Sequence, residues 1–268
     1  MSEPVVLYEK HGHVALITLN RPEKLNAYNA DVLALESEIW ADFRDDPKLL
    51  VAILTGAGDK SFCAGADLSM MNTIRDDDSP DKRITEIPLF HMGEHRIYKP
   101  IIAAINGYCV SGGLAHALMC DIRIAAEHAR FAFQQVKFAA VPSVIGTVVL
   151  PKYIGLSNAL YMILSAKQID AERALSWGLV HEVVPAKDLM SAAWEMADTL
   201  LMNSPTHMQV KKEAALRGIS LPIDEAKMMA GFLDARVPVS ESKEGTAAFL
   251  EKRRPDWSSV VAGLSESD

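Results

Sequence analysis

The chain has 268 residues, of which 49% are hydrophobic and 23% are charged, so it is long and apolar enough to bury a large core. Its net charge of −8, from 35 acidic and 27 basic residues, argues against nucleic acid as the main partner, because phosphate contacts need basic surface. No apolar run reaches the length of a membrane span, so no spanning segment is expected.

The ends and the cysteines of the chain favour a cytoplasmic protein. Residues 1–4, Met-Ser-Glu-Pro, lack the positive region and the apolar region of a secretory signal peptide. The three cysteines at positions 63, 109 and 120 have no CxxC spacing, and their odd number fits a reducing compartment. We therefore expect a cytoplasmic location.

The first part of the chain predicts a β-hairpin, a helix and a buried strand. Residues 5–9 and 14–19 are strand-like segments on either side of a His-Gly-His turn. A helix capped by Asn29 or Asn26 then runs to about Phe43, because its apolar residues recur at helical spacing. The next strand covers residues 50–55.

A first glycine-containing turn follows that strand at residues 61–68, Ser-Phe-Cys-Ala-Gly-Ala-Asp-Leu. The sequence predicts a short helix over residues 67–74, an exposed charged loop over 75–81, and a helix over 84–98 that ends at Lys99-Pro100.

A second glycine-containing turn follows the apolar run at residues 101–105, which predicts a buried strand. Ser111-Gly112-Gly113 then opens a short apolar helix, with Ser111 as the expected N-cap. A helix N-terminus presents unpaired N–H groups that suit a phosphate, a carboxylate or the oxyanion of a thioester enolate. A tight strand-to-helix turn with no ligand is the alternative.

The remaining chain predicts two short strands and then helices. The strands cover residues 122–126 and 131–133. A natural junction lies at Asn203-Ser204-Pro205, so we expect a core of residues 1–203 and a helical region of residues 204–268. The expected helices cover residues 156–164, 171–177, 188–201, 206–217, 224–236 and 241–253.

The two glycine-containing turns, AGADL at residues 64–68 and INGYxxxGG…CD at 105–121, resemble the crotonase (enoyl-CoA hydratase/isomerase) superfamily. The similarity extends through RPEKLNA at residues 21–27, DA at 170–171, WGLV at 177–180 and FLEKR at 249–253. The resemblance implies an α/β fold, a spiral of repeated ββα units with a C-terminal helical region. It also implies an acyl-CoA thioester as partner and a homotrimer or a dimer of trimers.

The resemblance also implies site residues. The peptide N–H groups of Ala66 and Gly112 would form an oxyanion hole around the thioester carbonyl, and attraction to the developing enolate would acidify the α-carbon. The remaining expected substrate-binding residues, at the two turns and around coenzyme A, are Ala64, Gly65, Asp67, Ala115, Gln135, Arg21, Lys24, Phe249 and Lys252.

The sequence departs from the family where the proton carriers are expected. Hydratases of the family place two glutamates at positions that align with Ala115 and Gln135, and neither of these side chains exchanges a proton at neutral pH. His116 is the nearest substitute with a useful pKa, and a buried, hydrogen-bonded histidine is the alternative interpretation. Efficient hydration by the two-glutamate mechanism is therefore not expected.

No metal site and no cofactor other than the coenzyme A of the substrate are expected. The HxxEH pattern at residues 91–95 and the His-Gly-His turn are explained by ordinary histidines, and no dinucleotide or ATP motif is present. The leading hypothesis is an acyl-CoA enzyme that stabilises a thioester enolate. The alternatives are an acyl-CoA-binding protein without activity and, more distantly, an acidic scaffold that has lost ligand and reaction.

Overall fold

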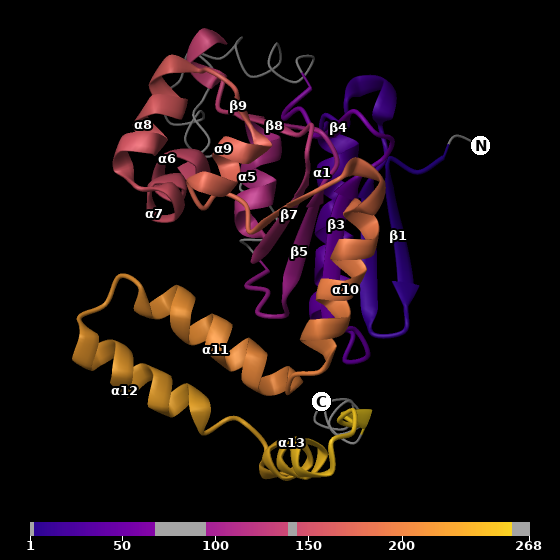
Figure 1. Ribbon diagram of the computed structural model, residues 1–268, viewed down its shortest axis with the longest axis vertical. Coiled ribbons are helices and arrows are strands. Elements are labelled where there is room, and N and C mark those ends of the chain that lie inside the picture. Colours follow the sequence, from indigo (N-terminus) through magenta and orange to yellow (C-terminus); the bar gives the residue numbers. More distant parts are fainter. Residues whose placement is uncertain (1–2, 68–94, 139–143, 259–268) are drawn as a thin grey trace.

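The computed structural model describes residues 3–67, 95–138 and 144–258. Figure 1 shows a two-sheet core surrounded by helices, with the last helices extending beyond one end of it. The larger sheet has six strands in the order β1-β2-β3-β5-β7-β10. These strands are β1 (Val6–His11), β2 (Val14–Leu19), β3 (Val51–Gly56), β5 (Ile101–Ile105), β7 (Ile122–Ala126) and β10 (Glu182–Val184).

The smaller sheet contains the strands that follow β3, β5 and β7 along the chain, together with β9. Its order is β4-β6-β8-β9, so β3, β5 and β7 are each followed by a strand that crosses to the second sheet. This alternation repeats along the chain and produces the predicted spiral of ββα units. The four strands are β4 (Ser61–Cys63), β6 (Tyr108–Val110), β8 (Arg130–Ala132) and β9 (Ile169–Asp170).

The inner strands of the larger sheet are buried on both faces. Val51 and Ile53 of β3 pack toward α10 (Leu189–Leu201), whereas Ala52 and Leu54 belong to the main core on the other face. Because both faces are covered, an unbroken apolar run is required in place of alternation. The main core contains the apolar face of α1 (Ala30–Asp45), whose N-cap is Asn29, as predicted: its side chain accepts a hydrogen bond from the N–H of Val32 at 3.0 Å.

The remaining elements surround this core. Short 3₁₀ turns cover Pro22–Lys24, Gln135–Phe138 and Ala186–Asp188. The remaining helices are α5 (Gly112–Met119), α6 (Val144–Val148), α7 (Leu150–Ile154), α8 (Leu156–Ser165), α9 (Ala171–Ser176), α11 (Pro205–Gly218), α12 (Ile223–Asp234) and α13 (Val239–Glu251).

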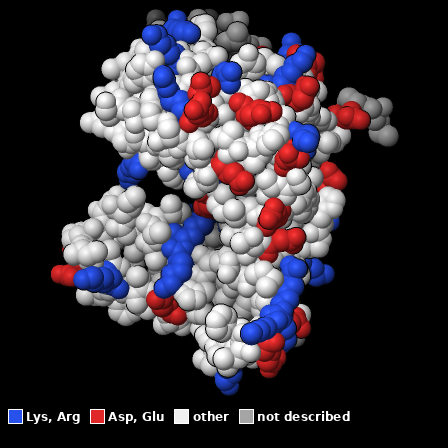
Figure 2. Space-filling model, in the orientation of Figure 1, with Lys and Arg blue, Asp and Glu red and all other residues white. Residues whose placement is uncertain are grey.

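The helices α11, α12 and α13 extend away from the core (Figure 1). Lys212 of α11 joins them to it, because its ammonium group donates to a carboxylate oxygen of Asp121 at 2.7 Å and to the carbonyl of Lys99 at 3.0 Å. Figure 2 shows a hollow between this helical region and the core, and acidic and basic side chains interspersed over the face drawn.

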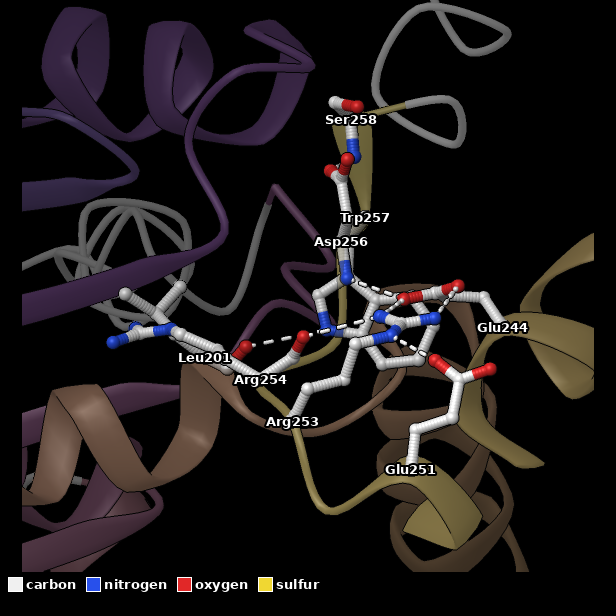
Figure 3. A network of polar contacts seen from close by, with 8 residues as sticks. All are labelled: Leu201, Glu244, Glu251, Arg253, Arg254, Asp256, Trp257 and Ser258. Atoms are coloured by element: carbon white, nitrogen blue, oxygen red, sulfur yellow. Dashed lines mark hydrogen bonds and ion pairs between the residues drawn. The ribbon is translucent and has the colours of Figure 1, made fainter. Parts of the chain in front are cut away.

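The chain after α13 returns to the end of α10. In Figure 3, Arg253 is held by Glu244 and Glu251, and the indole N–H of Trp257 donates to the carbonyl of Leu201 at 3.2 Å. Trp257 is buried. These contacts fix the last described turn against the helix that covers the larger sheet.

The structure corrects one predicted helix, and other predicted segments lie outside the residues it describes. Residues 95–98 form a turn and an irregular segment, so the helix predicted over 84–98 does not reach its expected end. The rest of that helix, the charged loop over 75–81 and all but Asp67 of the helix predicted over 67–74 lie outside the described residues. Asp67 itself is not helical.

Candidate active site

The first glycine-containing turn leaves the end of β4. The N–H of Tyr28 donates to the carbonyl of Gly65 at 2.9 Å, and the N–H of Asp67 donates to the carbonyl of Tyr28 at 2.8 Å. This parallel bridge uses the peptide groups on either side of Ala66, so the N–H of Ala66 points away from Tyr28. Gly65 has a φ of +96°, a conformation that favours glycine.

The second turn connects β6 to α5 through Ser111. Its φ of +54° and ψ of −113° are unusual for a residue with a side chain. The prediction that its side chain caps the helix is wrong: Ser111 makes no capping bond, and its hydroxyl oxygen accepts the N–H of Gln134 at 3.2 Å. The start of α5 is therefore left open, with Gly112 as its first residue.

The two turns lie in direct contact. A Cβ atom added to Gly65 would lie 3.0 Å from the amide nitrogen of Gly112, and one added to Gly113 would lie 2.0 Å from the carbonyl oxygen of Cys63. Within the described residues, neither the N–H of Ala66 nor that of Gly112 donates a hydrogen bond. Two neighbouring peptide donors of this kind can bind an oxygen atom on which negative charge develops.

Tyr28 contacts both turns, and the sequence analysis did not identify it. Its main chain bonds to Gly65 and Asp67, and its ring lies against Gly112, where an added Cβ would be 2.4 Å from the hydroxyl oxygen. Burial raises the pKa of Tyr28 above its usual value, so the phenol stays protonated at neutral pH. Its backbone role leaves no mark in the side-chain pattern, which explains why the sequence did not reveal it.

Beneath Gly112 lies a buried pair formed by Glu36 of α1 and His116 of α5. The imidazole Nε2 is 3.1 Å from a carboxylate oxygen of Glu36, and Nδ1 is 3.1 Å from the carbonyl oxygen of Gly112. The side chains are 2% and 3% exposed, respectively. His116 is thus buried and hydrogen-bonded, which was the alternative interpretation. Its tentative catalytic role stays a prediction.

Glu36 was also missed, although the sequence contained a signal for it. Val32, Ile39 and Phe43 mark the core face of α1 at helical spacing, and Glu36 falls on the same face. A charged residue at a core position needs a partner, so the spacing of Glu36 predicts a buried polar contact for α1.

The two positions at which the resemblance implies glutamates are Ala115 and Gln135. Ala115 lies three residues after Gly112 on the same face of α5 and is fully buried. Gln135 is partly buried and directly follows Gln134, whose N–H bonds to Ser111. Ala115 therefore lies within one helical turn of Gly112, and Gln135 adjoins the residue that bonds to Ser111.

The basic residues expected to contact coenzyme A differ in their surroundings. Arg21 donates to a carboxylate oxygen of Asp67 at 3.0 Å and to the carbonyl of Ala27 at 2.6 Å, so its guanidinium group braces the first turn. Lys24 is exposed beside the same turn, where the neighbouring carbonyl of Leu25 accepts the N–H of Ala64.

Phe249 and Lys252 are not brought together with the two turns within this chain. Both lie at the end of α13, which Figure 1 shows well separated from α5. Phe249 is highly exposed, and Lys252 is the C-cap of the helix. Their expected contacts with coenzyme A remain predictions.

The cysteines offer no activated thiol. All three are free and buried, and burial raises the pKa of Cys63 and of Cys120 to about 12 and that of Cys109 well above its usual value. Among residues 3–67, 95–138 and 144–258, no three His, Cys, Asp or Glu side chains come together as a metal-ligand group. His91 of the HxxEH pattern lies outside these ranges, whereas His95 is 3.3 Å from the hydroxyl of Ser37.

Comparison with solved structures identifies the class of the fold. Enoyl-CoA hydratase from Bacillus anthracis is similar over 94% of this chain and 98% of that chain, with a TM-score of 0.85 and 32% sequence identity. The spiral of ββα units is therefore the crotonase fold, as predicted. Residues 9–260 match the enoyl-CoA hydratase/isomerase family, and the chain belongs to that family.

Two relatives illustrate the range of similar proteins. The chain is 41% identical to (E)-benzylidenesuccinyl-CoA hydratase from Thauera aromatica, over 94% of this chain and 98% of the relative. It is 37% identical to short-chain-enoyl-CoA hydratase from Clostridium acetobutylicum, over 93% and 95%. Both relatives are hydratases of CoA thioesters, with different acyl groups in their names.

Proposed function

We propose that this protein is an acyl-CoA enzyme of the enoyl-CoA hydratase/isomerase type, in which the N–H groups of Ala66 and Gly112 bind the thioester oxygen. The observation that supports this proposal is the contact between the two turns, each of which has a peptide N–H that donates no hydrogen bond within the described residues. The named activities of the relatives support a CoA thioester as the substrate class. No separate cofactor enters the proposal.

The proposed chemistry passes through a thioester enolate. When a nucleophile adds to the β-carbon of an enoyl thioester, or when the α-proton is removed, an electron pair moves onto the carbonyl oxygen. Two fixed N–H donors stabilise that charge, and removal of one such donor typically costs about 10²–10³ in rate. In this scheme Ala64, Gly65 and Asp67 shape the first turn, Arg21 braces it through Asp67, and the exposed Lys24 would contact a phosphate of coenzyme A.

The absence of carboxylates at positions 115 and 135 limits which reactions we propose for this protein. Neither Ala115 nor Gln135 can give or take a proton, so we do not expect the two-glutamate mechanism, and Gln135 holds water or ligand by hydrogen bonds. The same observation favours a second candidate function, an acyl-CoA-binding protein that keeps the donors and has no activity.

Acyl-CoA binding and α-proton exchange separate these functions. By calorimetry, an acyl-CoA should bind more tightly than the free acid or coenzyme A alone, because only the thioester reaches both the donors and the phosphate side. Nuclear magnetic resonance in deuterated water then follows the α-protons of a saturated acyl-CoA. We expect deuterium to enter this position. Binding without exchange would favour the binding protein, and a folded protein that binds no acyl-CoA would contradict both functions.

We further propose that the protein assembles as a homotrimer or a dimer of trimers. Large apolar side chains on the C-terminal helices are open in the single chain: Phe232 is 73%, Phe249 is 83% and Leu250 is 73% exposed. Apolar surface of this kind favours a protein interface. Light scattering should give a particle mass of three or six times the chain mass, and Phe232→Glu should lower this particle mass. A monomer at micromolar concentration would contradict the assembly.

A cytoplasmic location also remains a proposal, supported by the three buried free thiols. Within the described ranges, the structure contains no helix with the length and apolar content needed to cross a membrane.

A further inference from the structure

The hydrogen bonds of the Glu36–His116 pair restrict where its protons lie. A carbonyl oxygen only accepts, so Nδ1 of His116 must carry the proton that bonds to the carbonyl of Gly112. Nε2 faces the carboxyl group of Glu36 at 3.1 Å, and one proton lies between them. The ring is therefore held at both nitrogens, by the carbonyl of Gly112 and by the carboxyl group of Glu36.

The carboxyl group of Glu36 uses one oxygen, Oε2, for its contact with His116. Within the described part of the chain, its second carboxylate oxygen, Oε1, is buried and has no hydrogen-bond partner. A buried ion pair of this kind stabilises a fold poorly, and replacing one by apolar side chains of similar size is often neutral or stabilising. Packing of α1 against α5 therefore does not explain why two polar residues occupy this position.

The place of the pair relative to Gly112 suggests another role. The imidazole stands between Gly112 and Glu36, so the ring lies nearer to the donor turn than the carboxyl group does. His116 lies one turn inside α5, and the helix dipole is positive at the N-terminal end of this helix. The ring of Tyr28, 5.5 Å from that of His116 between centroids, packs over the same turn.

We propose that Glu36 and His116 form an ion pair that positions Gly112 and adds positive potential at its N–H, so that the thioester carbonyl is more strongly polarised. The bond to the Gly112 carbonyl fixes the orientation of the residue whose N–H is the donor. His116 is a positioning residue in this account, because it is buried and both ring nitrogens are engaged. The inference rests on the proposed acyl-CoA function.

The test compares the wild type with Glu36→Leu/His116→Leu, which removes both charges and keeps an apolar contact. Crotonyl-CoA labelled with ¹³C at the thioester carbonyl reports polarisation through its infrared stretching band, and α-proton exchange of a saturated acyl-CoA reports enolate formation. We expect the double variant to fold and to bind acyl-CoA within a few-fold of the wild type. The frequency of the carbonyl band should return toward its value for free crotonyl-CoA in solution. The rate of α-proton exchange should fall about tenfold, which is less than the fall expected when a whole donor is removed.

Two controls make the outcome specific. Lys211→Met/Asp234→Asn removes an exposed ion pair between α11 and α12 and should leave the band and the exchange unchanged. Glu36→Gln keeps the side-chain shape and removes the charge, so it should shift the band in the same direction as the double variant. If the double-leucine protein does not fold, Glu36→Gln alone tests whether the Glu36–His116 pair affects polarisation of the thioester carbonyl.

Failure of the inference and failure of the proposed function give different results. A wild-type band that is shifted on binding, and that stays equally shifted in Glu36→Gln and in the double variant, would overturn the positioning role alone. A wild-type protein that binds no acyl-CoA would overturn the proposed function, and the positioning role with it.

Discussion

Replacing Gly113 by alanine is expected to lower the free energy of unfolding by about 3 kcal/mol and to abolish acyl-CoA binding. An added Cβ would lie 2.0 Å from the carbonyl oxygen and 2.6 Å from the carbonyl carbon of Cys63, and these backbone atoms cannot rotate away. The strand end and α5 must then separate, which moves the Gly112 donor away from the Ala66 donor. Denaturant unfolding measures the first effect and calorimetry with acyl-CoA the second.

Gly231→Ala is the matched control, because an added Cβ there would meet nothing within 4 Å in this chain. Gly231 lies in the last turn of α12, so alanine should stabilise the helix by up to about 1 kcal/mol and leave binding unchanged. If Gly113→Ala unfolds at the same denaturant concentration as Gly231→Ala and binds acyl-CoA equally well, the contact between the two turns is not required.

Much of the fold follows from local sequence patterns. The apolar runs at Val14–Leu19 and Ile101–Ile105 predict both strands with their observed ends, because strands buried on both faces are continuous in apolar residues. The short strands β4, β6, β9 and β10 were missed as strands. Two or three residues hold too little periodic signal, and these strands form only because partners far along the chain pair with them.

The candidate site, like the fold, could be predicted from the sequence only in part. The glycines at positions 65 and 112 identify the two turns, because glycine lets the backbone come close to another group. Only the folded chain shows that the two turns are in contact with each other. Ser111 illustrates the limit of local reasoning, because its hydroxyl oxygen accepts from the N–H of Gln134 on a neighbouring strand exit in place of the helix start. Glu36 and His116 are 80 residues apart, and no spacing rule connects them.

Restoring both acids, with Ala115→Glu and Gln135→Glu, is expected to raise the rate of crotonyl-CoA hydration by about tenfold or more. General acid–base catalysis typically contributes about 10²–10⁴, and both positions flank the Gly112 turn, so the carboxylates would reach the proposed thioester site. The gain should fall short of the full factor, because Ala115 is fully buried and a glutamate there must displace neighbouring atoms. Hydration is followed by the loss of the enoyl thioester absorbance.

The control for this variant is Ala115→Gln with Gln135 unchanged, which brings nearly the same side-chain volume without a carboxyl group. It should bind crotonyl-CoA like the double variant and show no gain in hydration, since an amide exchanges no proton. Gln135→Glu alone tests the more tolerant position, because that residue is only partly buried. A folded double variant that binds crotonyl-CoA and hydrates it no faster than Ala115→Gln would show that the pocket differs from a two-glutamate hydratase at further positions. In that event the donors of Ala66 and Gly112 would serve a reaction whose proton carrier lies elsewhere.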